Sequence, residues 1–298
     1  VLTGSSAKVG NYPGITVERH EGKLPLPRTG SAQVIDVPGT YSLSARSEEE
    51  RIALEAIAGL GGNPRPDLVV VVVDATQLSR NLYLALQVIE LGMPVVVALS
   101  MVDVLAKKNS QVDEAAIAAE LGVPVVGVTA VNGSGLDELR AAIDGALADP
   151  KPAPVRWAPT AEVQAFLDPI CDQLPAEWDA TGPRCAALSL WALLSLDSDD
   201  EHAAIPEGLR RAVLESRAAA DAAGRNLEQE IIETRYAWID VRSDRFHPSG
   251  ERRLHDRTDR FDRVLLHPVA GFGIFLVMMT VVFQALFTAA NPLIDLIG

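Results

Sequence analysis

Asp36 and Gly39 stand in the spacing Asp-x-x-Gly, directly after a short apolar run that predicts a β-strand. A carboxylate there can hold Mg²⁺, and a glycine lets a backbone amide meet a phosphate oxygen with no side chain in the way. By itself this spacing is often a simple turn. Together with the motifs described below it is typical of a segment that senses a γ-phosphate, so nucleotide-controlled switching is our first hypothesis for Asp36, Val37, Pro38 and Gly39.

A phosphate-binding loop of the form Gly-x-x-x-x-Gly-Lys-Ser/Thr occurs nowhere in the 298 residues. Such a loop would cradle the β-phosphate and supply a lysine and a Mg²⁺-binding hydroxyl. The usual spacing places it about twenty residues before Thr16, just ahead of Val1. The chain also begins without Met and without a leader that resembles a signal peptide. We therefore expect a truncated nucleotide site that by itself neither binds GTP tightly nor hydrolyses it.

A candidate first switch lies upstream of Asp36, in the five residues Gly14, Ile15, Thr16, Val17 and Glu18. The hydroxyl and carbonyl of Thr16 could close over Mg²⁺ and the γ-phosphate, as a mobile switch does. Residues 9–14 are rich in turn formers and predict a loop that orders around a ligand. We therefore expect Thr16 and Asp36 to share one Mg²⁺ ion.

Base selectivity is expected from four residues that hold the place of an Asn-x-x-Asp motif, namely Ser100, Met101, Val102 and Asp103. The Asp103 carboxylate can accept hydrogen bonds from guanine N1 and N2, which adenine does not offer. A serine cannot replace both the donor and the acceptor of an asparagine side chain, so we expect Ser100 to weaken guanine affinity. The loop in which backbone amides would meet guanine O6 is Thr129, Ala130 and Val131.

Apolar runs alternate with helical patterns across the first half of the chain. The runs cover residues 67–74, 94–99 and 123–128, and the helical patterns cover residues 80–92, 112–121 and 135–148. This alternation predicts a doubly wound α/β domain, in which the first valine run is a strand buried on both faces. In such sheets ligands bind at the carboxyl ends of the strands, where the candidate residues stand.

A proline-rich stretch after Asp149 is too stiff and too poor in donors for a helix or a central strand. We therefore place a nucleotide-binding domain at residues 1–149, a linker at residues 150–159 and a helical domain at residues 160–263. Within the last of these, the patterns at residues 209–223 and 227–239 predict helices.

Residues 269–294 form 26 consecutive positions without a charged side chain. At about 1.5 Å per residue a helix of that length spans about 39 Å, more than the roughly 30 Å hydrocarbon core of a bilayer. Residues 264–298 therefore predict a transmembrane helix, with a buried core helix as the alternative. Seven arginines between Arg242 and Arg263, against five acidic residues, favour a cytoplasmic location for the preceding domains. A single helix cannot enclose a pore, so a permeation domain would lie beyond Gly298.

Composition argues against several other functions. The net charge of −14 disfavours a surface for nucleic acid. Cys171 and Cys185 show neither Cys-x-x-Cys nor Cys/His ligand spacing, so we expect no disulfide framework and no metal site, which fits a reducing, cytosolic setting. The five histidines form no ligand cluster, and His267 before Pro268 is better explained as the start of the apolar helix than as an iron ligand.

Three stretches resemble the ferrous iron transport protein B family: Val9–Glu18, Asp36–Leu43 and Asp74–Leu84. The segment Asp259–Pro268, which leads into the apolar helix, is similar too. The resemblance extends over essentially the whole chain, and the sequences at residues 11–14 and 38–43 are specific to that family rather than to GTPases at large.

The resemblance implies a P-loop-type GTPase domain whose first strand and phosphate loop are missing here, an α-helical domain that modulates nucleotide release, and a multi-pass membrane domain that passes Fe²⁺ across the bacterial inner membrane. It implies GTP or GDP, Mg²⁺ held by Thr16 and Asp36, and K⁺ as cofactors. The implied partners are the lipid bilayer, ferrous iron, small cytoplasmic accessory proteins of the iron uptake system and further copies of the chain. Members lack a catalytic Gln after the second-switch glycine, and because Thr40 stands there, no catalytic residue is assigned.

Two other interpretations stay open. A soluble GTPase of the ribosome-assembly kind would need a basic RNA-binding face and no apolar C-terminal segment, so charge and hydropathy count against it. A pseudo-GTPase membrane anchor that only binds partners is favoured by Ser100 and by the missing phosphate loop. An upstream phosphate loop in the parent reading frame would eliminate the anchor.

Overall fold

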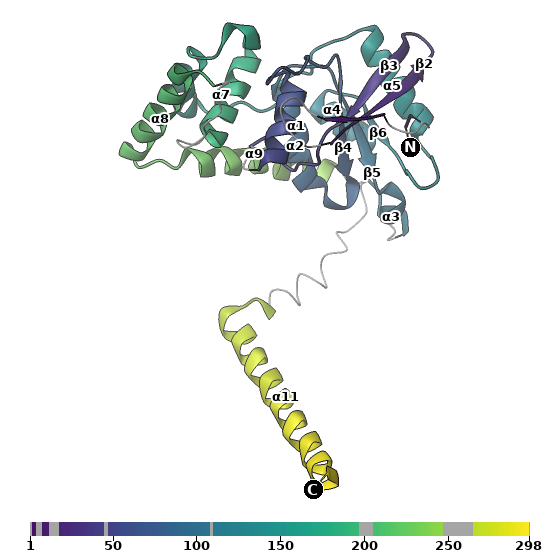
Figure 1. Cartoon of the computed structure of the whole chain (residues 1–298), viewed down its shortest axis with the longest axis vertical. Helices are drawn as coiled ribbons and strands as arrows, with labels where there is room; N and C mark the ends of the chain where they lie inside the picture. Colours follow the sequence, from purple (N-terminus) through teal and green to yellow (C-terminus); the bar gives the residue numbers. More distant parts are fainter. Residues whose placement is uncertain are drawn as a thin grey trace. The chain divides into compact units, whose positions relative to one another are not determined.

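The computed structural model describes residues 2–3, 8–11, 18–44, 47–107, 110–196, 205–246 and 265–297. The chain divides into two compact units, Val1–Pro248 and Ser249–Gly298, and each is described by itself (Figure 1). The first unit holds both hydrogen-bonded sheets and the candidate site, and the second holds one long helix.

The first unit contains a three-stranded parallel sheet. Its strands, in spatial order, are β4 (Val69–Asp74), β5 (Val95–Ser100) and β6 (Val125–Gly127). The intervening elements are η1 (Ala75–Gln77), α2 (Leu78–Glu90), α3 (Val102–Lys107) and α4 (Glu114–Leu121), and α5 (Leu136–Ala148) follows β6. Parallel neighbours need such helical crossovers. The predicted strands and helices of this domain, and its doubly wound α/β character, are confirmed.

The valine run in β4 is buried on one face only, which differs from the prediction. Val71 and Val73 are buried beside α2, whereas Val72 is 63% exposed. The helix on the other side, α5, packs mainly on β5 and β6, so the face of β4 around Val72 stays uncovered. A continuous apolar run therefore does not by itself establish burial on both faces.

An antiparallel sheet precedes the parallel sheet in the chain. Its strands are β1 (Lys8–Asn11), β2 (Glu18–Leu26) and β3 (Gly30–Asp36), in that order. The predicted loop at residues 9–14 is wrong for residues 9–11, because their backbone pairs with residues 18–20 of β2. Cross-strand hydrogen bonds fix those residues although their side chains favour turns.

The turn between β2 and β3 is tied to α5 by one carboxylate. Asp144 accepts from the amides of Arg28 and Thr29 at 2.8 and 3.0 Å, and from the Thr29 hydroxyl at 2.8 Å. Desolvation alone would raise the pKa of Asp144, but these hydrogen bonds outweigh it and lower that pKa. Leu24 of β2 belongs to the same buried cluster as Val96 of β5, so the hairpin covers part of the parallel sheet.

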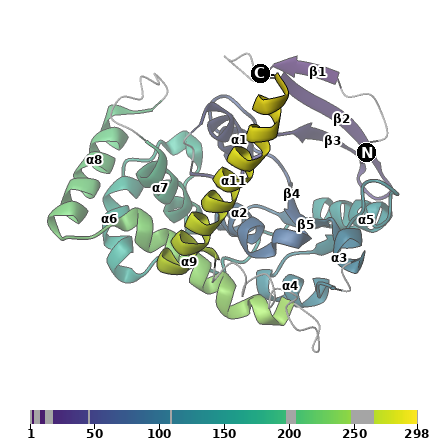
Figure 2. The same cartoon turned by 90° about the horizontal axis from the view of Figure 1, so that it is seen from below.

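Helices make up the rest of the described first unit. They are α1 (Glu48–Ala58), which follows the candidate second switch, and α6 (Ala161–Cys171), α7 (Pro183–Ser195), α8 (Glu207–Ala222) and α9 (Leu227–Ser243), with short turns η2 (Ala176–Trp178) and η3 (Asp244–Phe246). The helices predicted at residues 209–223 and 227–239 are confirmed as α8 and α9. Figures 1 and 2 show α7 and α8 at one end of this unit and the strands at the other.

The proline-rich stretch lies against the core instead of standing away from it. Trp157 is 6% exposed, and the amide of Ala153, itself buried, donates to the carbonyl of Met93 at 3.0 Å. One buried apolar cluster runs from β4 and β5 through α2 into α6, α7, α8 and α9. The nucleotide-binding and helical segments therefore share a core.

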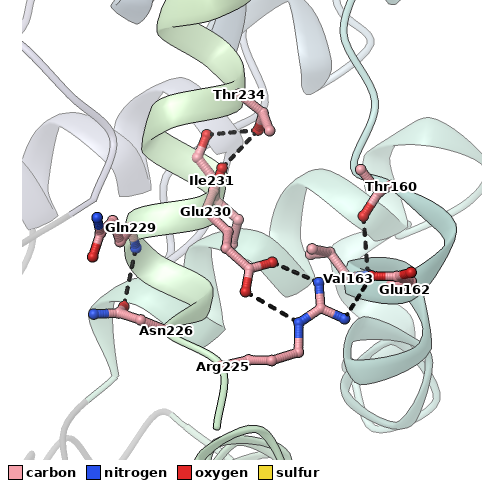
Figure 3. Close-up of polar contacts among 9 residues, drawn as sticks. All are labelled: Thr160, Glu162, Val163, Arg225, Asn226, Gln229, Glu230, Ile231 and Thr234. Carbon is pink, nitrogen blue, oxygen red and sulfur yellow. Dashed lines mark hydrogen bonds and ion pairs between the residues drawn. The ribbon is translucent and has the colours of Figure 1, made fainter. Parts of the chain in front are cut away.

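Arg225 joins the beginnings of α6 and α9 (Figure 3). Its guanidinium lies 2.5 and 3.1 Å from the carboxylate of Glu230 and 3.0 Å from that of Glu162. Thr160 caps α6 and Asn226 caps α9, each through its side-chain oxygen. The hydrogen bonds from Arg225 lower the pKa of Glu230, because they favour the ionised carboxylate.

Cys171 and Cys185 form a disulfide, which overturns the expectation of two unconnected cysteines. Cys171 ends α6 and Cys185 lies in the first turn of α7, and the packing of these helices brings their Cα atoms to 5.6 Å. The spacing in the sequence carries no such signal, because the contact depends on how the two helices pack.

The second unit contains α11 (Pro268–Ile297). Among the described residues, the helical stretch Pro268–Leu286 has the length and the mean hydropathy, 2.2, to cross a membrane, and none of its most apolar window is buried. The predicted apolar helix is thus present.

A buried ion pair connects α2 to α9. Arg235 donates from Nη2 and Nε to the carboxylate of Glu90 at 2.7 and 3.2 Å, and from Nη1 to the Tyr83 hydroxyl at 3.3 Å. The side chains of the pair are only 2% and 6% exposed, and the guanidinium stands 4.4 Å from the ring centre of Trp157. Burial raises the pKa of Glu90, and the charge and hydrogen bonds of Arg235 act against that rise.

Removing one partner of this pair should destabilise the first unit strongly. Glu90→Leu leaves the Arg235 charge buried without a counter-ion, and we expect it to lower the free energy of unfolding by roughly 3–5 kcal/mol. Urea titration followed by tryptophan fluorescence measures this. As a matched control, Glu215→Leu breaks an exposed pair with Arg211 and should cost at most about 0.5 kcal/mol. Equal losses in the two variants would contradict the role given to the buried pair.

Candidate nucleotide-binding site

The candidate second switch begins where β3 ends. Asp36 is the last residue of β3, is exposed, and pairs across the sheet with His20 of β2. The next residues have no regular structure, and a methyl group placed on Gly39 would meet no atom of the described residues within 4 Å. The described part of the chain therefore leaves open space where a side chain of residue 39 would stand. An exposed carboxylate beside open backbone can receive a cation and a phosphate oxygen.

After Gly39 the chain packs against the core again. The Tyr41 ring is 58% exposed and lies under the guanidinium of Arg80, 4.0 Å from its centre. Leu43 is buried, and its amide donates to Oε1 of Gln87 on α2 at 2.8 Å. The open segment is therefore held at its far end by one buried hydrogen bond.

Gln87 also connects this segment to the buried ion pair. Gln87 and Glu90 are three positions apart on α2 and so lie on one face of the helix. Both line a small cavity together with residues of α1, α7 and α9, including Leu54, Trp191 and Arg235. The candidate second switch and α9 thus contact side chains one turn apart on α2, the former at Gln87 and the latter at Glu90.

Gln87, Glu90 and Arg235 were not among the predicted site residues. A signal was available for two of them, since two polar residues three positions apart interrupt the apolar face of α2. The partner on α9 carried no signal, because Arg235 follows α2 by more than a hundred residues.

The candidate guanine-reading segment begins at the carboxyl end of β5. The Ser100 hydroxyl donates to the carbonyl of Val73 at 3.2 Å, and Met101 has a positive φ of 62°, a conformation that is unfavourable for a side chain of this size. Val102 begins α3 and packs on the core, and Asp103 follows in its first turn. The Asp103 carboxylate lies 3.1 Å from the ammonium group of Lys107 and is one-third exposed.

The third candidate segment, Thr129 to Val131, lies next to the Ser100 segment. The amide of Val128 donates to the carbonyl of Leu99 at 2.7 Å, which places the two loops at one edge of the sheet. The Thr129 amide is used within its own loop, where it donates to Ser134 at 2.9 Å, while Val131 is 98% exposed. An amide for a ligand would therefore come from Ala130 or Val131 rather than from Thr129.

The structure thus groups some of the predicted site residues and not others. Ser100–Asp103 and Thr129–Val131 share the carboxyl edge of the parallel sheet, as predicted from the strand pattern. Asp36 ends a strand of the other sheet. Of the candidate first switch, Glu18 begins β2, and Gly14, Ile15, Thr16 and Val17 lie outside the described residues.

Known families and curated proteins resemble this chain. The model of a family described as Ferrous iron transport protein B matches residues 1–143. An Fe(2+) transport protein A/Fe(2+) transporter FeoB fusion protein of Porphyromonas gingivalis is 35% identical over 98% of this chain and 35% of its own length. The Fe(2+) transporter FeoB of Escherichia coli K12 is 34% identical over 99% of this chain and 37% of its own length. The chain spans little more than a third of these relatives.

Solved structures share the fold. The cytosolic domain of L. pneumophila FeoB matches with a TM-score of 0.68 at 26% identity, over 83% of this chain and 92% of that chain. A GDP-bound mutant of the S. thermophilus FeoB G-domain matches with a TM-score of 0.64 at 30% identity, again over 83% and 92%. Sequence, fold and the order of the candidate motifs agree, and the chain therefore belongs to the ferrous iron transport protein B family.

Proposed function

We propose that this chain is the cytoplasmic control region and the first membrane helix of a protein that moves Fe²⁺ across the cell membrane under the control of GTP binding and hydrolysis. Family membership supports the transport function, and the solved FeoB structures bound to GDP and to mGMPPNP support a guanine nucleotide. The observation that carries the proposal is the open backbone at Gly39 beside Asp36, with the far end of the same segment bonded to α2.

The nucleotide would contact three groups of residues. The first switch, Gly14–Glu18, and the second switch, Asp36–Gly39, would face the γ-phosphate, and Asp103 would accept from guanine N1 and N2. Asp103 would have to exchange its exposed contact with Lys107 for the base, and such exposed pairs contribute little. The loop Thr129–Val131 would approach guanine O6.

A magnesium ion fits the chemistry of these residues. The Asp36 carboxylate and the Thr16 hydroxyl are oxygen donors of the kind that Mg²⁺ prefers, and Asp36 lies exposed at a strand end. When bound, the ion would neutralise charge on the phosphate oxygens. The role of this chain's own residues is to position the phosphate: Gly39 would present its amide and leave room for the ligand.

The helical segments would sense the nucleotide through α2. A change in the position of Gly39 would move Leu43, whose amide donates a hydrogen bond to Gln87 of α2. Glu90, one turn further along α2, pairs with Arg235 of α9, so a shift of α2 would reach α9. The proposal gives a physical basis for the modulation of nucleotide release that the family resemblance implies.

The membrane part of the proposal rests on α11. Its apolar stretch would be the first of several spans, with residues 1–263 on the cytoplasmic side of the inner membrane. The P. gingivalis relative is a fusion with an Fe(2+) transport protein A, which supports a small accessory partner for this chain as well. Dependence on K⁺ and self-association remain predictions from the resemblance.

The Ser100→Asn substitution should tighten guanine nucleotide binding. The carboxamide adds a donor and an acceptor, and one added hydrogen bond of about 1 kcal/mol corresponds to roughly fivefold in Kd. Calorimetric titration of the complete gene product with GDP measures the effect, with ADP as the test of selectivity. Ser100→Ala, which only removes the hydrogen bond to Val73, is the matched control. An unchanged Kd for GDP in Ser100→Asn would argue against the proposed position of the base.

A polypeptide of only these 298 residues should show no GTP turnover. It contains no phosphate loop, so the main cradle for the β-phosphate and the lysine that accompanies it are lacking. Phosphate release from GTP in the presence of Mg²⁺ measures turnover, and the complete gene product is the control. Measurable Mg²⁺-dependent turnover by the 298-residue polypeptide would refute this part of the proposal.

The Asp36→Ala substitution should abolish most iron uptake by cells that carry the complete gene. Removing the carboxylate removes a ligand for Mg²⁺ and the response to the γ-phosphate. Uptake of radioactive ferrous iron by cells without their own transporter measures it. Asp67→Ala is a matched control, since Asp67 is an exposed carboxylate just before β4 begins, at the edge of the parallel sheet opposite to Ser100 and Thr129. Normal uptake with Asp36→Ala would break the proposed link between switch and transport.

A further inference from the structure

The disulfide between Cys171 and Cys185 lies in the part of the chain that matches cytosolic domains. Its Cα atoms are 5.6 Å apart, inside the range of about 4.4–6.8 Å that a disulfide requires without movement of the backbone. The solved structures that match this region are described as cytosolic domains of FeoB. Thiols are kept reduced in the cytosol, and disulfides that form there are usually transient and redox-sensing.

We propose that Cys171 and Cys185 form a reversible thiol–disulfide site that exchanges with small disulfides and thiols of the glutathione class. The proposal goes beyond nucleotide and iron binding and depends on neither. The bond between the two sulfur atoms breaks and re-forms with the redox state of the cytosol while the surrounding helices stay folded.

The surrounding core does not depend on the bond. Leu167 and Ile170 of α6 and Leu188 of α7 are fully buried, and they belong to the large apolar cluster. Both helices also contact α8, so several apolar contacts hold them without the sulfur atoms. Opening the disulfide would therefore leave α6 and α7 packed, as a reversible site requires.

The two sulfur positions differ in access. Cys171 is half-buried at the end of α6, and Cys185 is 8% exposed in the first turn of the 13-residue helix α7. Cys171 is thus the thiol that an external reagent reaches. The amino-terminal end of a helix favours a negative charge, so Cys185 is placed to react and to leave as a thiolate.

The exchange takes place in two steps. The Cys171 thiolate attacks one sulfur of a small disulfide, a mixed disulfide forms, and the first small thiol leaves. Cys185 attacks the Cys171 sulfur, the bond between the two cysteines forms, and the second small thiol leaves. Two protons and two electrons have passed from the protein to the small disulfide. Reduction by an excess of small thiol reverses both steps.

The loop that the bond closes touches the nucleotide-binding segments. Residues 172–184 contain Asp179, which pairs with Arg65 at 3.1 Å, and Arg184, which donates to the carbonyl of Ala58 at 2.6 Å. Ala58 is the last residue of α1, the helix that follows the second switch. A closed disulfide restricts the motion of this loop, so oxidation would reduce the local opening of the C-terminal end of α1.

Peptide mapping tests the redox step directly. The complete gene product in detergent is equilibrated at set ratios of reduced to oxidised glutathione, trapped with N-ethylmaleimide and cut with trypsin without reductant. Cleavage after Arg184 puts the cysteines on separate peptides, residues 157–184 and 185–210. We expect the two peptides to be joined in oxidised buffer, with a loss of two hydrogen atoms in mass, and to separate again in reduced buffer. Peptides that stay alkylated at every ratio, or stay joined in excess dithiothreitol under native conditions, would overturn the proposal.

Single variants test the order of attack. In Cys185→Ser the remaining Cys171 should take up one glutathione, and in Cys171→Ser the remaining Cys185 should stay free of it. The reverse pattern would overturn the assignment of Cys171 as the attacking thiol.

Hydrogen exchange tests the connection to α1. The amides around Leu60, which donates to the carbonyl of Glu55, should exchange more slowly after oxidation, while those around Ile117 in α4 should not change. The variant without either cysteine should show no difference between the two buffers. Equal exchange around Leu60 in the oxidised and reduced protein would overturn the connection.

Discussion

The ion pair of Glu90 with Arg235 sets the constraint on which the arrangement of the first unit depends. Two charges that are almost completely buried are costly unless each satisfies the other, so the pair favours the register of α2 and α9 in which Glu90 and Arg235 meet. The same helix α2 packs on β4 and accepts, at Gln87, the hydrogen bond from the end of the candidate second switch. Helix α2 thus contacts the parallel sheet, the candidate second switch and the helical segments.

Because α2 contacts both segments, the predicted nucleotide-binding and helical domains pack against each other at their boundary. The stretch at residues 150–159 was predicted from its prolines as a linker, and it does connect the two segments in sequence. Trp157, however, lies in the core beside Arg235, and apolar contacts continue through α2 into α7 and α9. A domain defined by its sequence pattern can therefore be packed firmly against its neighbour.

The elements that sequence predicted well are those whose signal is local. The valine runs predicted β4 and β5, and the periodic apolar residues predicted α2, α8 and α9. The candidate segments at Ser100 and Thr129 lie at one sheet edge because parallel strands end together. The features that were missed depend on distant pairing: β1 forms by hydrogen bonding to β2, the disulfide by the packing of α6 on α7, and the partner of Glu90 by the approach of α9. No local pattern encodes such contacts.

The open space around Gly39 has a consequence for how this segment can vary. Because an added methyl group would meet no atom of the described residues, packing in that part of the chain does not require glycine here. A glycine in a tight turn such as Gly135, where an added carbon would fall 2.0 Å from a backbone oxygen, serves the fold itself. Under the proposed function, thermal stability and response to nucleotide are therefore separable properties at Gly39, and a single added methyl group there would give a well-folded but unresponsive protein.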